Sequence, residues 1–163
     1  MADTKAIHVE ILGDLAATTG LAARLAMLAR PGDVIALYGL LGAGKTALAR
    51  GFIRARARIA GTPDVAAEVP GPTFTLAQLY ELDDAPIWHF DLYRLERAEE
   101  VWELGLEAAL ADGIALIEWP ERLGPLLPAD RLDVTLEFGA EEDTRRVRIV
   151  GHGGWAARVP ALA

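Results

Sequence analysis

The feature that most constrains this chain is the eight-residue segment from Gly39 to Thr46, GLLGAGKT, which matches the pattern G-x4-G-K-[ST]. A short apolar run, Val34–Tyr38, precedes it, and a segment of helical periodicity over about Lys45–Ile59 follows it. In such a strand–loop–helix unit, glycines let several backbone N–H groups point inward, where they and the helix N-terminus hold phosphate oxygens. The segment therefore predicts a phosphate-binding loop rather than a Gly-rich turn with a chance Lys-Thr pair.

The residues of this loop have distinct expected roles. Lys45 is expected to reach the β- and γ-phosphates of a nucleoside triphosphate as a point charge, which makes it a candidate catalytic residue. The Thr46 hydroxyl is expected to bind Mg²⁺. The predicted nucleotide-binding residues of the loop and the first helical turn are Gly39, Leu41, Gly42, Ala43, Gly44, Lys45, Thr46 and Ala47.

The rest of the chain alternates short apolar runs with helical segments, which predicts a layered α/β sheet. Strands are expected at 7–12, 34–38, 73–82, 87–92, 114–117, 132–138 and 145–150. Helices are expected from a cap at Thr18 or Thr19 to about residue 29, at 45–59, and at 98–111 with a break at Gly105. The strands at 73–82 and 87–92 should form one hairpin, and those at 132–138 and 145–150 should form another. The sheet should therefore be mixed rather than purely parallel. Together with the loop, the pattern predicts a P-loop NTPase-like three-layer fold with a mixed central sheet.

The 163 residues suit a single P-loop domain, 1–163, with a hydrophobic core of its own. We expect the Gly-rich tail from about residue 151 to be loose. The N-terminus lacks a basic start followed by a long apolar run, and no stretch of about 18 apolar residues occurs. Neither a secretion signal nor a membrane contact is therefore predicted, and the expected location is cytoplasmic.

Composition excludes several kinds of chemistry. The chain contains no cysteine, serine or asparagine, which removes disulfides, thiolate metal sites and cysteine or serine nucleophiles. Its three histidines are spread over positions 8, 89 and 152, which disfavours a histidine-based zinc site. The net charge of −8 argues against strong independent binding to nucleic acid, because such binding depends on Lys and Arg.

A phosphate loop of this kind also needs an acidic residue at the end of a neighbouring strand, which holds Mg²⁺ or its water. Glu118 follows the apolar run 114–117, and Asp91 ends the apolar strand that starts at residue 87. Either acid could simply meet solvent, but beside the loop we expect at least one of them to contact the metal shell. Both are therefore candidate catalytic residues.

Two further features have alternative interpretations. His89 lies two residues before Asp91 on the same strand face, so it is either one half of a catalytic pair or a hydrogen-bonded structural histidine. Two sets of arginines are most simply solvated faces, with a docking surface for a partner as the sharper alternative: Arg50, Arg54 and Arg58 after the loop, and Arg146 and Arg148 on the last strand.

The chain can be sorted among nucleotide-binding enzymes by what it lacks. A Ras-like GTPase would need an Asn-Lys-x-Asp motif, which a chain without asparagine cannot contain, and no Asp-x-x-Gly segment occurs. A kinase of a small hydroxylated acceptor stays possible, although the chain is short and shows no Arg-rich lid. A third possibility is a nucleotide-dependent interaction module in which hydrolysis is incidental.

Four segments, in their order and spacing, resemble the TsaE (YjeE) family. They are GLLGAGKT from Gly39, GPTFTL from Gly71, HFDLYR from His89 and IEWPE from Ile117. Many families share the phosphate loop alone, whereas its combination with His-x-Asp-x-Tyr-Arg and Glu-Trp-Pro is specific. The resemblance covers nearly the whole chain, from about residue 14 to residue 150.

The resemblance implies a bacterial ATPase required to make N6-threonylcarbamoyladenosine at position 37 of tRNAs that read codons starting with A. Members of the family do not transfer the group themselves but bind a TsaB–TsaD pair, which ATP turnover resets between cycles. The implied cofactors are ATP and Mg²⁺. We expect weak activity of the isolated chain, stimulation by the partners, and contact with tRNA only through the complex, which fits the net charge of −8.

The resemblance also implies residue roles. Thr46 and Glu118 match the Mg²⁺ ligands of the family, and Asp91 matches a residue needed for hydrolysis. Thr73 lies in a segment that resembles a switch sensing the γ-phosphate. Trp119 is placed where it could couple the site to a partner.

Two positions depart from the family pattern. Leu40 stands where the family usually has Asp, and Gly71 stands where it usually has Ser. Neither change removes a phosphate or metal ligand, so nucleotide binding is still expected. Leu40 is expected to alter how water or a partner approaches the γ-phosphate, and Gly71 is expected to loosen the switch.

Overall fold

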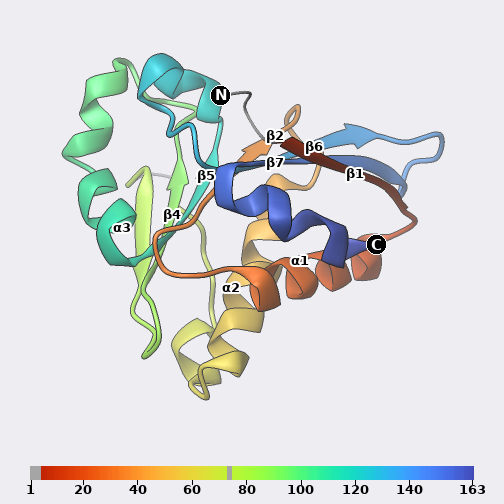
Figure 1. Cartoon of the computed structure of the whole chain (residues 1–163), viewed down its shortest axis with the longest axis horizontal. Coiled ribbons are helices and arrows are strands. Elements are labelled where there is room, and N and C mark those ends of the chain that lie inside the picture. Colours follow the sequence, from red (N-terminus) through yellow and green to blue (C-terminus); the bar gives the residue numbers. More distant parts are fainter. Residues whose placement is uncertain (1–4, 73–74) are drawn as a thin grey trace.

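The computed structural model describes residues 5–72 and 75–163 of the chain (Figure 1). The strands are β1 Lys5–Leu12, β2 Val34–Tyr38, β3 Ala77–Tyr80, β4 Ile87–Asp91, β5 Ile114–Glu118, β6 Leu132–Phe138 and β7 Arg145–His152. The α-helices are α1 Leu15–Leu28, α2 Lys45–Ile59 and α3 Leu106–Asp112. Short 3-10 helices are η1 Pro63–Ala66, η2 Ala98–Trp102, η3 Pro120–Leu126, η4 Gly153–Ala157 and η5 Val159–Leu162.

The seven strands form one sheet in the order β1-β7-β6-β2-β5-β4-β3. The central strands β6, β2, β5 and β4 are joined by parallel pairing. Antiparallel pairs add β7 and β1 at one edge and β3 at the other, so the sheet is mixed, as predicted. Because neighbouring parallel strands end on the same side, the carboxyl ends of β2, β5 and β4 meet where the phosphate loop begins, which is where open α/β sheets bind ligands.

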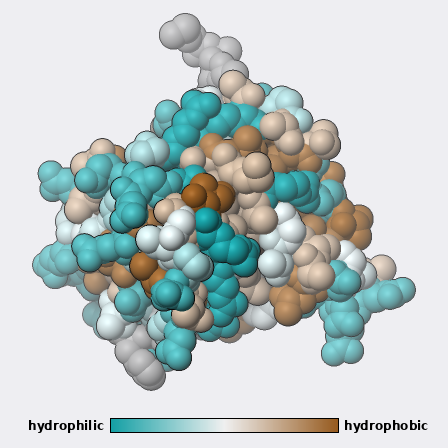
Figure 2. All heavy atoms as spheres, turned by 90° about the horizontal axis from the view of Figure 1, so that it is seen from below, coloured by the Kyte–Doolittle hydropathy of each residue, from teal (hydrophilic) through white to brown (hydrophobic). Residues whose placement is uncertain are grey.

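Hydrophobic cores lie on both faces of this sheet. One core, on the lower side of the sheet in Figure 1, is formed with α1, α2 and the C-terminal segment and includes Leu25, Phe52 and Trp155. The other is formed with η2, α3 and η3 and includes Phe90 and Leu106. The result is the predicted three-layer α/β arrangement. Seen from below, the surface shows interspersed hydrophilic and hydrophobic side chains (Figure 2), since the helices turn their apolar sides to the sheet.

Helix α2 begins and ends where the sequence predicts, whereas α1 ends near the predicted residue 29 but begins earlier than predicted. Asp14, rather than Thr18 or Thr19, is the N-cap of α1, and its carboxylate accepts a hydrogen bond of 2.8 Å from the backbone N–H of Ala17. Thr18 lies inside the helix and is buried. The prediction placed the cap too late because it took the first threonines of the segment, although aspartate caps equally well.

The remaining boundaries agree with the sequence in most places. The break expected at Gly105 is present, with a φ of 104° that favours glycine, and it separates η2 from α3. Strand β3 is shorter than the predicted 73–82, and residues 73 and 74 lie outside the described residues. Strand β5 extends one residue beyond the prediction and includes Glu118.

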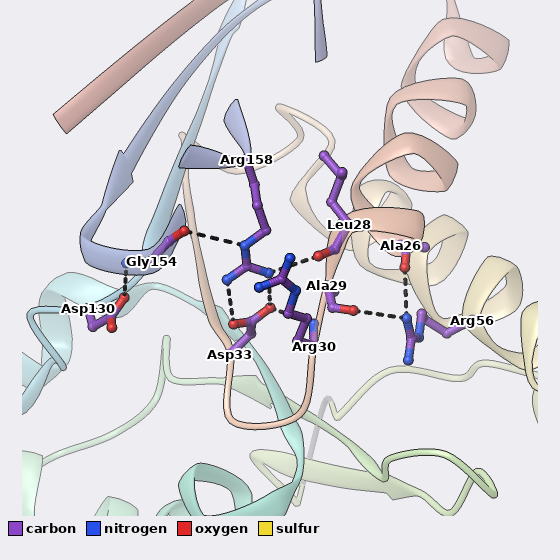
Figure 3. A network of polar contacts seen from close by, with 9 residues as sticks. All are labelled: Ala26, Leu28, Ala29, Arg30, Asp33, Arg56, Asp130, Gly154 and Arg158. Atoms are coloured by element: carbon purple, nitrogen blue, oxygen red, sulfur yellow. Dashed lines mark hydrogen bonds and ion pairs between the residues drawn. The ribbon is translucent and has the colours of Figure 1, made fainter. Parts of the chain in front are cut away.

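The tail differs from the expectation that it would be loose. Trp155 is 1% exposed, and Val159 and Leu162 are also buried. The guanidinium of Arg158 donates to Asp33 at 2.7 and 2.9 Å and to the carbonyl of Leu28 at 2.8 Å (Figure 3). These contacts attach the tail to the layer that contains α1.

Across the two described ranges, we find no helix with the length and apolar character needed to cross a membrane.

Candidate functional site

The predicted phosphate loop, Gly39–Thr46, joins β2 to α2 at the carboxyl edge of the sheet. Its glycines have backbone angles that other residues rarely adopt, with φ of 148° at Gly39, 80° at Gly42 and 112° at Gly44. A Cβ atom on Gly39 would also lie 2.7 Å from the carbonyl oxygen of Leu136 on β6. Gly44 is the N-cap of α2 and has no side chain, so the first N–H groups of the helix stay open to an anion.

Lys45 is buried at the start of α2, with 5% of its surface exposed. Its ammonium donates to the carbonyl oxygens of Gly39 and, at 3.4 Å, Leu40, and it lies 3.8 Å from the centre of the Trp119 ring. Burial lowers the pKa of Lys45, because desolvation disfavours the charged amine. Three nearby carboxylates act in the opposite direction, those of Glu118, Glu121 and Asp91.

Glu118, the last residue of β5, is 2% exposed and has two hydrogen-bonding partners. Its Oε1 accepts from the Thr46 hydroxyl at 2.8 Å, and its Oε2 lies 2.7 Å from Nε2 of His89. His89 is completely buried on β4. The hydrogen bond of His89 therefore goes to Glu118 on the neighbouring strand, which favours a structural role over a catalytic pair with Asp91.

Asp91 ends β4 and lies directly beside Glu118 in the pairing of β4 with β5. Its carboxylate accepts a hydrogen bond of 3.2 Å from the backbone N–H of Tyr93. Burial raises the pKa of Asp91, and the negative charge of Glu118 acts in the same direction, while the Tyr93 N–H, His89 and Lys45 oppose it. An acid with a raised pKa beside a phosphate loop is suited to accepting a proton or orienting a water.

Trp119 follows Glu118 with a φ of 58°, in the left-handed region that is unfavourable for a bulky residue. Its ring lies against the ammonium of Lys45, and the ring centre of Tyr93 is 5.0 Å away. Trp119, Leu40 and Glu121 help to line a groove of about 510 Å³ beside the loop. The Trp119 ring thus covers the ammonium of Lys45, and Tyr93 packs against Trp119.

These residues fit a magnesium ion and phosphate groups. Two oxygen ligands in adjacent octahedral positions around Mg²⁺ lie ~3 Å apart, and Thr46 Oγ1 and Glu118 Oε1 are 2.8 Å apart. Within the described part of the chain, no group of three or more His, Asp or Glu could hold a metal alone.

The structure brings the predicted catalytic and metal-binding side chains together at one edge of the sheet: Lys45, Thr46, Asp91 and Glu118. Leu41 is 65% exposed, and because its side chain has no polar group, it could contribute only its backbone N–H. Thr73 lies outside the described residues, and its role stays a prediction. Gly71 has a φ of 83°, a conformation that favours glycine over the serine usual in the family.

Sequence reasoning missed two contributions to this site. The link from His89 to Glu118 joins different strands, so only the sheet register reveals it. Arg145 on β7 donates to the carbonyl of Ala43 in the loop, and no motif marks it.

The helix arginines have mixed roles. Arg54 and Arg58 are exposed on α2, as the solvated-face interpretation predicts. Arg50 instead donates to the carbonyls of Val69 at 3.0 Å and Pro70 at 3.3 Å. It therefore attaches the segment before Gly71 to the helix that carries the phosphate loop.

Comparison with known proteins adds independent information. Residues 12–147 match the model of a family described as "Threonylcarbamoyl adenosine biosynthesis protein TsaE". The chain is 39% identical over 152 residues to a tRNA threonylcarbamoyladenosine biosynthesis protein TsaE from Rickettsia felis, covering 93% of this chain and 85% of that protein. It is 34% identical over 137 residues to a protein of the same description from Bacillus subtilis, covering 83% and 80%. The crystal structure of Bacillus subtilis YdiB superposes with a TM-score of 0.72 at 25% identity, covering 99% and 96%.

Proposed function

The chain belongs to the TsaE family, which acts in threonylcarbamoyladenosine biosynthesis in tRNA, and from this premise we propose that it is a Mg²⁺-dependent ATPase. Its ATP turnover resets a TsaB–TsaD complex between rounds of modification. In this proposal tRNA is contacted only through the complex, which a net charge of −8 favours.

One observation carries the ATPase proposal. The Thr46 hydroxyl, at the start of the helix that follows the phosphate loop, lies 2.8 Å from a carboxylate at the end of the adjacent parallel strand β5. This arrangement of a loop hydroxyl and a strand-end acid is what P-loop enzymes use to hold Mg²⁺. A Gly-rich turn without nucleotide chemistry would not require the buried Lys45 beside it.

The residues of the site divide the work of binding. The first N–H groups of α2 and the ammonium of Lys45 hold the β- and γ-phosphates, so Lys45 leaves its carbonyl partners when a nucleotide binds. Thr46 and Glu118 would hold Mg²⁺, which supplies positive charge to the phosphate oxygens. His89 keeps the Glu118 carboxylate in one orientation through its 2.7 Å hydrogen bond.

Asp91 is the residue we assign to the attacking water. Its carboxylate lies beside Glu118 and within the electrostatic influence of Lys45, close to where the γ-phosphate would be. The water oxygen forms a bond to the γ-phosphorus, while the bond from the γ-phosphorus to the oxygen bridging to the β-phosphate breaks and ADP leaves. Asp91 orients the water or accepts its proton. The raised pKa of Asp91 makes its carboxylate a better proton acceptor than an ordinary surface acid.

The test is phosphate release from ATP, measured with the pure chain and again after addition of purified TsaB–TsaD from the same source. The proposal requires free phosphate, faster release with the pair, and loss of both in Glu118→Ala. ADP formed together with a phosphorylated acceptor would point to a kinase. Partner binding that depends on ATP and survives in Glu118→Ala, without any hydrolysis, would point to an interaction module.

A further inference from the structure

The β6–β7 hairpin contacts the loop between β2 and α2. Arg145, the first residue of β7, donates from Nε to the carbonyl of Ala43 at 3.0 Å and from Nη2 to the carbonyl of Gly42 at 3.4 Å. The same guanidinium donates to two carbonyls of its own hairpin, those of Glu142 at 2.7 Å and Thr144 at 2.8 Å. One rigid group therefore joins the middle of the phosphate loop to the hairpin.

The position of Arg145 is itself fixed. Its backbone is paired with Leu12 on β1 and with Phe138 on β6, and its guanidinium lies 4.8 Å from the centre of the Phe138 ring. At the other end of the loop, Gly39 packs against the carbonyl of Leu136 on the same hairpin. The hairpin thus contacts the loop at its beginning and at its middle.

These contacts determine where the loop N–H groups point. In a trans peptide the C=O and the following N–H point in opposite directions. Because Arg145 draws the Ala43 carbonyl toward β7, the N–H of Gly44 is turned away from β7, toward the side where phosphate is expected. The N–H of Ala43 is held within the loop, since it donates to the carbonyl of Leu40 at 3.0 Å.

We propose that Arg145 is a positioning residue of the phosphate site, which keeps the N–H groups of the loop oriented for anions before a nucleotide arrives. The inference rests on the proposed function, because it concerns the same site. The role needs a guanidinium, because one planar group must donate to carbonyls of both the loop and the hairpin. Lysine could supply the charge but could not reproduce both contacts.

The strand provides matched controls. Arg146 and Arg148 are exposed neighbours of Arg145 on β7, and Arg146 pairs with Glu137 on the surface at 3.3 Å. Replacing any one of the three with methionine removes one positive charge from the same strand. Only Arg145→Met also removes the contacts to the loop, so a difference between the variants reports those contacts and not the net charge.

The experiment measures binding of Mg-ATP and of inorganic tripolyphosphate by calorimetry, with melting temperatures and steady-state kinetics, for wild type and these variants. Arg145→Met should weaken binding of both ligands by roughly 10- to 100-fold, the loss expected for hydrogen bonds that involve a charged group. KM should rise more than kcat falls, because orienting the loop helps ground state and transition state alike. The affinities of Arg145→Lys should lie between those of wild type and Arg145→Met. Arg146→Met and Arg148→Met should change both affinities by less than about threefold.

Each other result has a defined meaning. Equal affinities for tripolyphosphate in Arg145→Met and the two control variants would overturn the inference, and so would a loss confined to ATP, which would place Arg145 against the nucleoside. If Arg145→Met does not fold, Arg145→Lys decides, and wild-type affinity in that variant would overturn the inference. A wild-type protein that binds neither ligand would refute the proposed function as well.

Discussion

The two ends of strand β2 hold charged groups in opposite ways. At the amino end, the guanidinium of Arg158 forms a bidentate ion pair with Asp33, with distances of 2.7 and 2.9 Å. Arg158 also donates to the carbonyl of Leu28 (Figure 3). At the carboxyl end, the ammonium of Lys45 is held by backbone carbonyls and an aromatic ring. Only five residues of strand separate the two arrangements.

Under the proposed function, the difference separates charges that stabilise the fold from charges that serve a ligand. Where opposite charges are matched, as between the half-buried Asp33 and Arg158, removing one leaves the other without its counter-charge. Where burial instead lowers the pKa of Lys45 and raises that of Asp91, the charged forms are disfavoured in the folded protein. Such groups cost stability, and a bound anion can recover that cost for the ammonium of Lys45.

The largest effect should come from Lys45→Ala. Loss of the ammonium should lower ATP turnover by at least roughly 10²- to 10³-fold, the scale of removing one preorganised donor to a developing charge. The melting temperature should stay equal or rise, because a buried cation is removed. Lys5→Ala, which removes an exposed lysine from β1, is the matched control. Normal turnover in Lys45→Ala would end the phosphate-loop interpretation.

Arg158→Met should show the reverse pattern. Leaving the half-buried Asp33 without its guanidinium partner should cost about 2 kcal/mol of folding free energy, or roughly 4–8 °C in Tm. ATP turnover below the new melting temperature should not change, since Arg158 lies at the other end of β2. Thermal unfolding beside Arg148→Met, an exposed arginine on β7, checks this. A small change in Tm with a large loss of turnover would break the contrast between the two ends.

Asp91→Asn should separate binding from hydrolysis. The amide keeps the size of the side chain but cannot accept a proton, so phosphate release should fall by roughly 10²-fold. Binding of Mg-ADP should be retained, because the phosphate-holding groups are untouched. Calorimetry and phosphate release on the same preparation test this, and loss of both would mean that Asp91 is structural.

The same variant should show the smallest effect, a pH-dependent gain in stability. Because the pKa of Asp91 is raised in the folded state, wild-type stability should fall as pH rises from the unfolded value of ~3.9 through the folded one. Asp91→Asn should therefore melt higher at pH 7, by less than about 4 °C, the shift that 1 kcal/mol gives in a chain of this size. The difference should vanish below pH ~3.9. A gap that widens in acid would contradict the sign.

Much of the fold could be predicted from the sequence, because the strongest local signals agree with the tertiary structure. Strand β2 and helix α2 match their predicted bounds, since an apolar run, a Gly-rich loop and a helical stripe follow each other without ambiguity. The prediction that the tail from about residue 151 is loose was wrong, because it relied on the glycines of this segment as a sign of flexibility. Its apolar residues Trp155, Val159 and Leu162 are spaced i, i+4, i+7, a pattern that indicates a buried face.

The candidate site could be predicted only where its chemistry is local. Lys45 and Thr46 follow from one motif, and the strand-end acids Asp91 and Glu118 follow from the requirements of that motif. The contacts of His89 and Arg145 could not be predicted, because each joins segments far apart in the chain through the sheet register. Long-range pairings of this kind leave no periodic signal in the sequence.

The aromatic partners of the two cations give the protein an optical consequence. The indole of Trp119 lies against the ammonium of Lys45, and a bound phosphate should draw that ammonium away from the ring. The centre of the Trp155 ring lies 3.9 Å from the guanidinium carbon of Arg158, and this contact should not change when a nucleotide binds. Fluorescence from Trp119 should thus change on titration with nucleotide, while that from Trp155 should change only on unfolding. In a variant with Trp88 and Trp102 replaced, Trp119 would report nucleotide binding and Trp155 would report unfolding of the same chain.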